Sequence, residues 1–136
     1  MKKILCLFLA VLLLCGCGGC AVVEKLDVTF IASHESPDGN YILSLYQVGS
    51  PQWSFGSVRG KLVLTRADGS KVQEEEISFN NDGGGVTENN IVNVAWWDTA
   101  VVVETRHFDT TQRNFYTIPY DGQEVTCSTT FVKTEY

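Results

Sequence analysis

The sequence predicts an all-β protein, an antiparallel β-sandwich of about eight short strands. From residue 27 onward, β-branched and aromatic residues recur in short alternating runs, which is typical of strands. No window shows the periodicity of an amphipathic helix, which repeats about every 3.6 residues. Turn residues separate the runs, and Asp-Gly occurs at Asp38, Asp68, Asp82 and Asp121. Short strands joined by such turns favour a sandwich over a helical or α/β fold.

The first 16 residues have the organisation of a signal peptide. Met1-Lys2-Lys3 is a short positive region, and residues 4–14 form an apolar run. A transmembrane helix needs about 20 apolar residues, so this run is too short to be one. Leu14-Cys15-Gly16-Cys17 resembles the lipobox of bacterial lipoproteins. The resemblance implies cleavage before Cys17, lipidation of its sulfur and stable anchoring by two or more acyl chains.

This interpretation divides the chain into a signal peptide (1–16), an acylated tether (17–26) and a single β domain (27–136). Lys2 and Lys3 leave with the signal, so the 10 Lys and Arg become 8, against 16 Asp and Glu, and the mature net charge is −8. No basic patch is visible, which argues against nucleic acid and anionic headgroups as partners. No cofactor motif is present, and the lipid is expected to provide the attachment to the membrane.

Each expected strand is bounded by turn residues. The strands are expected at residues 27–33, 40–48, 58–66, 71–79, 90–96, 100–106, 113–118 and 124–133. Glu74-Glu75-Glu76 predicts that the fourth strand lies at a sheet edge, because charges discourage edge-to-edge aggregation. Ala100-Val101-Val102-Val103 indicates burial on both faces, so the fifth and sixth strands are expected at a sheet centre.

Alternation along these strands assigns side chains to faces. In the first strand, Val28, Phe30 and Ala32 are expected to share one face. The expected core consists of Leu43, Leu45, Leu62, Leu64, Ile77, Phe79, Val92, Val94, Trp96, Val101 and Val103.

An ordered series of motifs runs through residues 36–120. It comprises Ser36-Pro37-Asp38-Gly39-x-Tyr41, Trp53-x-Phe55-Gly56, Asn81-Asp82-Gly83, Asn90 and Trp96. The series resembles a family of small uncharacterised secreted or membrane-anchored bacterial proteins, a domain of unknown function. The resemblance implies a β fold outside the cytoplasm, and it carries over no catalytic residues.

Two cysteines remain after processing and lipidation, Cys20 and Cys127. A disulfide between them is compatible with an oxidising compartment, and two unpaired thiols are equally compatible with the sequence. Cys17 and Cys20 have the spacing of a redox or metal motif, but alkylation of Cys17 removes one of the two sulfurs.

Two segments are candidates for binding. Trp53 and Phe55 lie between glycines, and they form either an exposed partner surface or, as we favour, a plug at one end of the sandwich. Residues 80–90 surround three glycines with oxygen-bearing side chains, of which Asp82 and Glu88 are weak calcium candidates. The spacing matches no EF-hand, so a glycine-rich connection is the favoured interpretation, and no metal site is predicted.

No catalytic residue is predicted. His34 and His107 are the only histidines, and they have neither zinc-site spacing nor a recognisable nucleophile beside them. An enzyme acting on cell-wall or glycan material would need two carboxylates facing one cleft. The candidates for that pair are Glu75, Asp82, Asp98 and Glu104.

The predicted function is that of a non-enzymatic lipoprotein of the cell envelope, held outside the cytoplasm by its lipid. Its β domain is expected to bind another envelope protein or a ligand. An inhibitor or immunity-type protein with an acidic surface is the alternative, and it predicts a basic partner and salt-sensitive association. The enzyme acting on cell-wall or glycan material is the third hypothesis.

Overall fold

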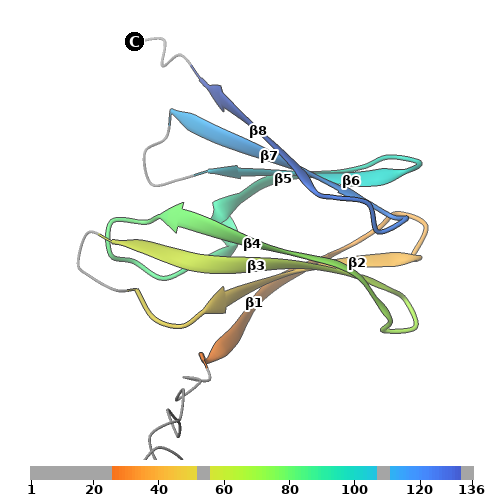
Figure 1. Cartoon of the computed structure of the whole chain (residues 1–136), viewed down its shortest axis with the longest axis horizontal. Coiled ribbons are helices and arrows are strands. Elements are labelled where there is room, and N and C mark those ends of the chain that lie inside the picture. Colours follow the sequence, from red (N-terminus) through yellow and green to blue (C-terminus); the bar gives the residue numbers. More distant parts are fainter. Residues whose placement is uncertain (1–25, 52–55, 107–110, 133–136) are drawn as a thin grey trace, which may run out of the picture.

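Two four-stranded antiparallel sheets pack face to face in the computed structural model, which describes residues 26–51, 56–106 and 111–132 (Figure 1). The first sheet consists of β1 (Val28–Glu35), β2 (Tyr41–Val48), β3 (Ser57–Arg66) and β4 (Lys71–Asn80). A short 3-10 helix, η2 (Glu88–Asn90), precedes the second sheet. That sheet consists of β5 (Ile91–Trp96), β6 (Ala100–Arg106), β7 (Gln112–Pro119) and β8 (Thr126–Phe131). The predicted all-β sandwich of eight strands is confirmed.

Each sheet is a meander, in which every strand pairs only with its neighbours in the sequence. Residues 81–90 form the connection from one sheet to the other. The turns that close the four hairpins, between β1 and β2, β3 and β4, β5 and β6, and β7 and β8, lie at one end of the sandwich (Figure 1). We call this end the turn end.

The core forms between the inward faces of the two sheets. Alternation along β2 and β3 places Leu43, Leu45, Leu62 and Leu64 inward, and all four are 0% exposed. The other buried members of the cluster are Val58, Ile77, Phe79, Val86, Val101, Val103, Tyr116 and Ile118. Burying an aliphatic or aromatic side chain contributes roughly 1.5–3 kcal/mol, so this cluster is the main source of stability.

The edge positions agree in part with the sequence analysis. β4 lies at an edge of its sheet, as the three consecutive glutamates predicted. β6 is an inner strand, as its run of apolar residues predicted, whereas the placement of the fifth strand at the centre was wrong. β5 is the first strand of a meander, so it pairs with β6 alone and leaves Val92 and Asn93 exposed.

A β-bulge in β5 changes which of its residues face the core. Ile91 pairs with Thr105 and Asn93 pairs with Glu104, so Val92 is the additional residue. Val92 is 44% exposed, and its predicted place in the core was wrong. Ile91, Val94 and Trp96 pack against the core instead, half-buried. An extra residue reverses the alternation on one side of the bulge, which explains this correction.

The same kind of irregularity lies in β1. The register shifts between Phe30 and Ala32, which places Ile31 against the core. Val28 and Phe30 point outward and are 54% and 55% exposed. The prediction that these two residues share a face with Ala32 was therefore wrong, for the same physical reason as in β5.

Some strand bounds also differ from the expected ones. β6 spans the predicted residues, whereas β8 is shorter than the predicted 124–133 and is exposed along its whole length. The helix η2 was not expected. Within the three described ranges, the structure contains no helix of the length and apolarity needed to cross a membrane.

Candidate functional site

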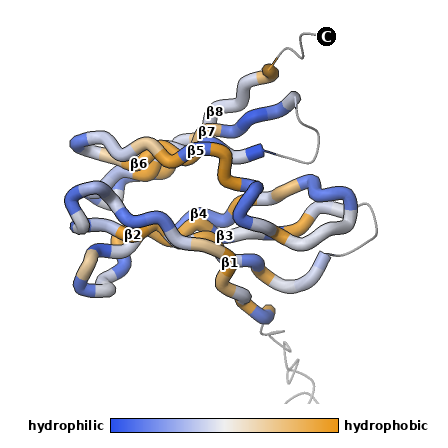
Figure 2. The backbone as a smooth tube through the Cα atoms, turned by 180° about the vertical axis from the view of Figure 1, so that it is seen from behind, coloured by the Kyte–Doolittle hydropathy of each residue, from blue (hydrophilic) through white to orange (hydrophobic). Residues whose placement is uncertain are grey.

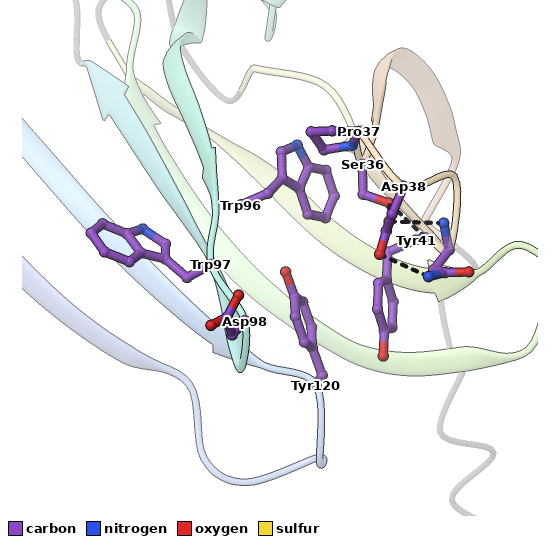
Figure 3. A pocket seen from close by; sticks show the side chains of 9 residues that line it. Ser36, Pro37, Asp38, Tyr41, Trp96, Trp97, Asp98 and Tyr120 are labelled. Carbon is purple, nitrogen blue, oxygen red and sulfur yellow. Dashed lines mark hydrogen bonds between the residues drawn. The ribbon is translucent and has the colours of Figure 1, made fainter.

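A pocket of about 470 Å³ opens at the turn end, where the β1 edge of one sheet meets the β5 edge of the other (Figure 3). Three hairpins contribute to it: the turn after β1, the turn after β5, and the residue that follows β7. The lining residues are Ser36, Pro37, Asp38, Asn40, Tyr41, Trp96, Trp97, Asp98 and Tyr120. We call this the turn-end pocket.

The first wall of the pocket is the turn between β1 and β2. The Gly39 amide donates to the Ser36 carbonyl at 2.9 Å, and Gly39 adopts a φ of 70°, which glycine tolerates and other residues resist. The Ser36 amide then donates to the Tyr41 carbonyl at 2.8 Å, which closes the hairpin. This local chemistry follows directly from Ser-Pro-Asp-Gly.

The carboxylate of Asp38 is held within that turn. It accepts hydrogen bonds from Ser36 Oγ at 2.6 Å, from the Asn40 amide at 3.1 Å and from Asn40 Nδ2 at 2.7 Å. The Ser36 hydroxyl, followed by the Asn40 donors, lowers the pKa of Asp38 below its usual value. Asp38 therefore presents a fixed negative charge at the pocket at neutral pH.

Two tyrosines connect the sheets beside this charge. The rings of Tyr41 and Tyr120 stack with centroids 4.2 Å apart and an interplanar angle of 11°. The Tyr120 amide donates to the Thr99 carbonyl at 3.0 Å, which places Tyr120 beside the β5–β6 turn. Burial, then the neighbouring Tyr41, Asp38 and Asp98, raise the pKa of Tyr120, so its hydroxyl stays protonated.

The β5–β6 hairpin supplies the tryptophans. Trp96 and Trp97 are consecutive, so their side chains leave opposite sides of the strand. Figure 3 shows the Trp96 ring directed toward Pro37, and the Trp97 ring directed away from Tyr120. Trp96 is half-buried against the core, whereas Trp97 is 65% exposed. Trp96 therefore forms a wall of the pocket, and Trp97 extends the aromatic surface beyond its rim.

The charged side chains of the lining carry charge of one sign. Among the described residues, the lining contains the carboxylates of Asp38 and Asp98 and no Lys, Arg or His. Asp98 is exposed, and within the described part of the chain its carboxylate forms no hydrogen bond or ion pair. The turn-end pocket therefore combines aromatic faces with two carboxylates. Asp38 is held by hydrogen bonds within its turn, and Asp98 can accept hydrogen bonds from a ligand.

Several residues singled out in the sequence lie outside the described residues. They are Cys17, Cys20, Trp53, Phe55 and His107. Cys127 is an exposed, unpaired thiol on β8 in the described part of the structure. Lipidation of Cys17, the Cys20–Cys127 disulfide and the role of the Trp53 segment accordingly stay predictions.

The calcium candidates do not converge. Asp82 and Glu88 are both exposed, and Asp82 adopts a left-handed φ of 49° in the connection between the sheets. Among the residues that the structure describes, no group of three or more His, Cys, Asp or Glu side chains could hold a metal ion.

The carboxylates considered for an enzyme are dispersed over the fold. Asp82 precedes β5 and Asp98 follows it, so they lie at opposite ends of that strand. Glu104 faces outward on β6 and pairs with Arg113, with Oε1 and Nε 3.4 Å apart. His34 is half-buried on β1, where its Nε2 is shielded from solvent and has no hydrogen-bond partner among the described residues. Only Asp98 belongs to the turn-end pocket.

Sequence reasoning did not identify this pocket, although several of its residues had been noted for other reasons. Tyr41 and Trp96 belonged to the motif series, and Asp98 was one of the dispersed carboxylates. The available signal was an aromatic residue within three positions of an Asp at three separate hairpin turns: Asp38 with Tyr41, Trp97 with Asp98, and Tyr120 with Asp121. Comparison of the chain with protein-family models, curated proteins and solved structures found no match.

Proposed function

We propose that the chain is a lipid-anchored protein of the cell envelope whose non-enzymatic β-sandwich binds another envelope protein or a ligand at the turn-end pocket. The observation that carries this proposal is the position of the pocket relative to the amino end of β1, which the proposed tether precedes. β1 begins at Val28, directly after the tether, and ends at Glu35, beside the pocket. A strand rises about 3.3 Å per residue, so β1 separates the two by more than 20 Å.

The surface near the tether supports a location beside a membrane. Leu26, Val28 and Phe30 are 41%, 54% and 55% exposed, and the ring of Phe30 meets that of Tyr46 edge to face at 5.7 Å. In Figure 2 the hydrophobic colouring continues along β1 toward the start of the described chain. Exposed apolar surface at this point suits a domain that a short acylated tether holds near lipid.

The composition of the pocket supports binding. Tyrosine and tryptophan provide a large contact area and lose little conformational freedom, and they are enriched where proteins bind partners. A pocket of about 470 Å³ also lies within the range of roughly 300–1,000 Å³ that is usual for ligand sites. The chemistry that the lining offers is therefore recognition through aromatic faces and carboxylates.

The anchor is tested in cells supplied with a fatty-acid probe. We expect Cys17→Ser to abolish labelling and to leave the uncleaved precursor, because the acylated sulfur is missing. Cys20→Ser is the matched control and should be labelled as the natural chain is. Undiminished labelling of the Cys17→Ser variant would refute the anchor.

The pocket is tested by placing a photo-crosslinking amino acid at position 97 in the lipidated protein. Position 128 on β8 is the control, since Ser128 is also exposed but does not line the pocket. We expect a discrete crosslinked partner from position 97 and none from position 128. Identical patterns from the two positions would contradict binding at the turn-end pocket.

The inhibitor-type alternative is favoured by one specific observation. The four hairpin turns carry Asp38, Asp68, Asp98 and Asp121, so the turn end is acidic (Figure 1). Such a surface would bind a basic enzyme with salt-sensitive association. If the crosslinked partner is an enzyme, its activity should fall on addition of this protein and recover at high ionic strength. Unchanged activity would exclude the inhibitor.

A further inference from the structure

We infer that the turn-end pocket binds a cationic nitrogen group. The group is either the ammonium or guanidinium group of a protein side chain or the ammonium group of a free amine. This inference rests on the proposed function in taking the pocket as a binding site, and it adds the chemical class of the bound group. The aromatic faces, the arrangement of the carboxylates and the absence of a cationic side chain from the described lining residues all favour it.

The aromatic rings provide the first attraction. The face of an aromatic ring carries negative charge density, and a cation is attracted when it lies within about 6 Å of the ring centroid. Trp96 lies half-buried on one side of the pocket, and the stacked Tyr41 and Tyr120 lie on another. Figure 3 shows the Trp96 and Tyr120 rings around the same space as Asp38 and Asp98.

The two carboxylates provide the second attraction, with different roles. Asp38 accepts three hydrogen bonds within its turn, so its charge is fixed and its geometry is determined before any ligand arrives. Asp98 has no such partner in the described structure and can form a charge-assisted hydrogen bond with an N–H donor. Both charges also contribute, after burial and Tyr41, to the raised pKa of Tyr120.

Other ligand classes fit the pocket less well. An anion would meet two carboxylates and, in the part of the lining that the structure describes, no compensating cation. A neutral sugar would stack on the rings and donate hydroxyl groups to Asp98, but it would gain no attraction from the negative charge. A cationic group is attracted both to the ring faces and to the carboxylates, so it matches the lining as it stands.

The experiment uses the full lipidated protein in detergent, with the indole N–H resonances of Trp96 and Trp97 followed by NMR. We expect Nα-acetyl-lysinamide to shift them saturably and Nε-acetylated Nα-acetyl-lysinamide, which has no charge on its side chain, to bind at least tenfold more weakly. Raising the salt concentration should weaken binding of the charged probe only.

Protein variants identify the groups responsible. Asp98→Asn should weaken binding of the charged probe at least tenfold, and Asp121→Asn, on a neighbouring turn outside the lining, should change it less than twofold. Asp98 is exposed and has no partner in the described residues, so Asp98→Asn should melt at the temperature of the natural protein, which excludes unfolding as the cause.

Several outcomes would overturn the inference: equal binding of the two lysine probes, an unchanged affinity in Asp98→Asn, or a saturable shift with N-acetylglucosamine alone.

A lysine-containing peptide that binds more tightly than spermidine would identify a protein side chain as the source of the nitrogen. The reverse order would identify a free amine. Failure of the proposed function is distinguishable, because loss of lipidation or of crosslinking at position 97 would leave the lysine titration unaffected.

Discussion

The side-chain amides of Asn81 and Asn90 exchange two hydrogen bonds, of 3.0 and 2.9 Å, across the connection between the sheets. Asn81 Nδ2 also donates to the Gly85 carbonyl at 2.8 Å, and Asn90 Nδ2 donates to the Arg106 carbonyl at 3.2 Å. Asn90 is 6% exposed, so this network is largely shielded from water. The amide pair fixes the path by which the chain passes from β4 to β5.

Replacing Asn90 by Ala should destabilise the fold by about 1–3 kcal/mol, because it leaves buried partners of the amide unsatisfied. Urea denaturation measures the loss as a shift in midpoint at constant slope. Asn89→Ala is the control, since Asn89 is exposed and contributes its carbonyl, 2.8 Å from Arg106 Nε, rather than its side chain. Equal losses for the two variants would contradict the role assigned to the amide pair.

Millimolar calcium should leave the melting temperature unchanged. The side-chain oxygens of Asn81 and Asn90 accept hydrogen bonds, and Asp82 and Glu88 are exposed with no further acidic ligand beside them among the described residues. Calcium needs six to eight oxygen ligands, which this connection does not bring together. Thermal unfolding followed by circular dichroism with calcium and with a chelator provides the measurement, and a clear rise with calcium would restore the site.

Gly60→Ala should destabilise the protein by about 1–3 kcal/mol through overpacking. A Cβ atom at Gly60 would lie 2.6 Å from Phe79 Cε2, and Phe79 is 1% exposed. Combining the change with Phe79→Leu should cost less than the sum of the two single changes, because the smaller side chain relieves the contact. Ser78→Ala, at an exposed position of the same strand pair, should have little effect. Strict additivity in the double variant would refute the steric explanation.

The Tyr116 hydroxyl should ionise at a higher pH than an ordinary tyrosine. Burial, followed by the neighbouring Cys127, raises the pKa of Tyr116 to about 12. Because the folded-state pKa exceeds the usual value of about 10, the stabilising contribution is complete below pH 10 and is lost as the pH rises through 12. The difference corresponds to roughly 2–3 kcal/mol. Urea midpoints between pH 8 and 12 should therefore fall more steeply in the natural protein than in Tyr116→Phe, and parallel profiles would contradict the assignment.

Where apolar and polar residues alternate strictly, the sequence predicts correctly which side chains face the core. Leu43, Leu45, Leu62 and Leu64 alternate without interruption, and all four are buried as predicted. The edge strands β1, β4 and β5 have register irregularities instead, and no residue type at Ile31, Val72 or Val92 marks where the extra residue falls. A bulge depends on how the partner strand continues its pairing, which is a tertiary property.

The turn-end pocket could not be predicted because it depends on which sheet edges meet. The Asp-Gly sequences predict turns, but they do not show that the β1 edge lies over the β5 edge. The same alignment of the sheets brings Tyr41, at the start of β2, against Tyr120, which follows β7 and lies 79 positions later in the chain. Local propensities describe each hairpin separately, whereas the pocket is lined by residues of three hairpins at once.

The meander order of both sheets also determines how the chain can assemble. All the residues that build the first sheet, 28–80, precede all those that build the second, 91–131. A chain that emerges from its amino end can therefore complete the first four-stranded sheet before the strands of the second sheet are present. No strand has to pass through a loop or pair with a distant segment. Until the second sheet packs against it, however, the leucine-rich inner face of the first sheet is exposed to solvent. During that interval this face is the surface most prone to self-association.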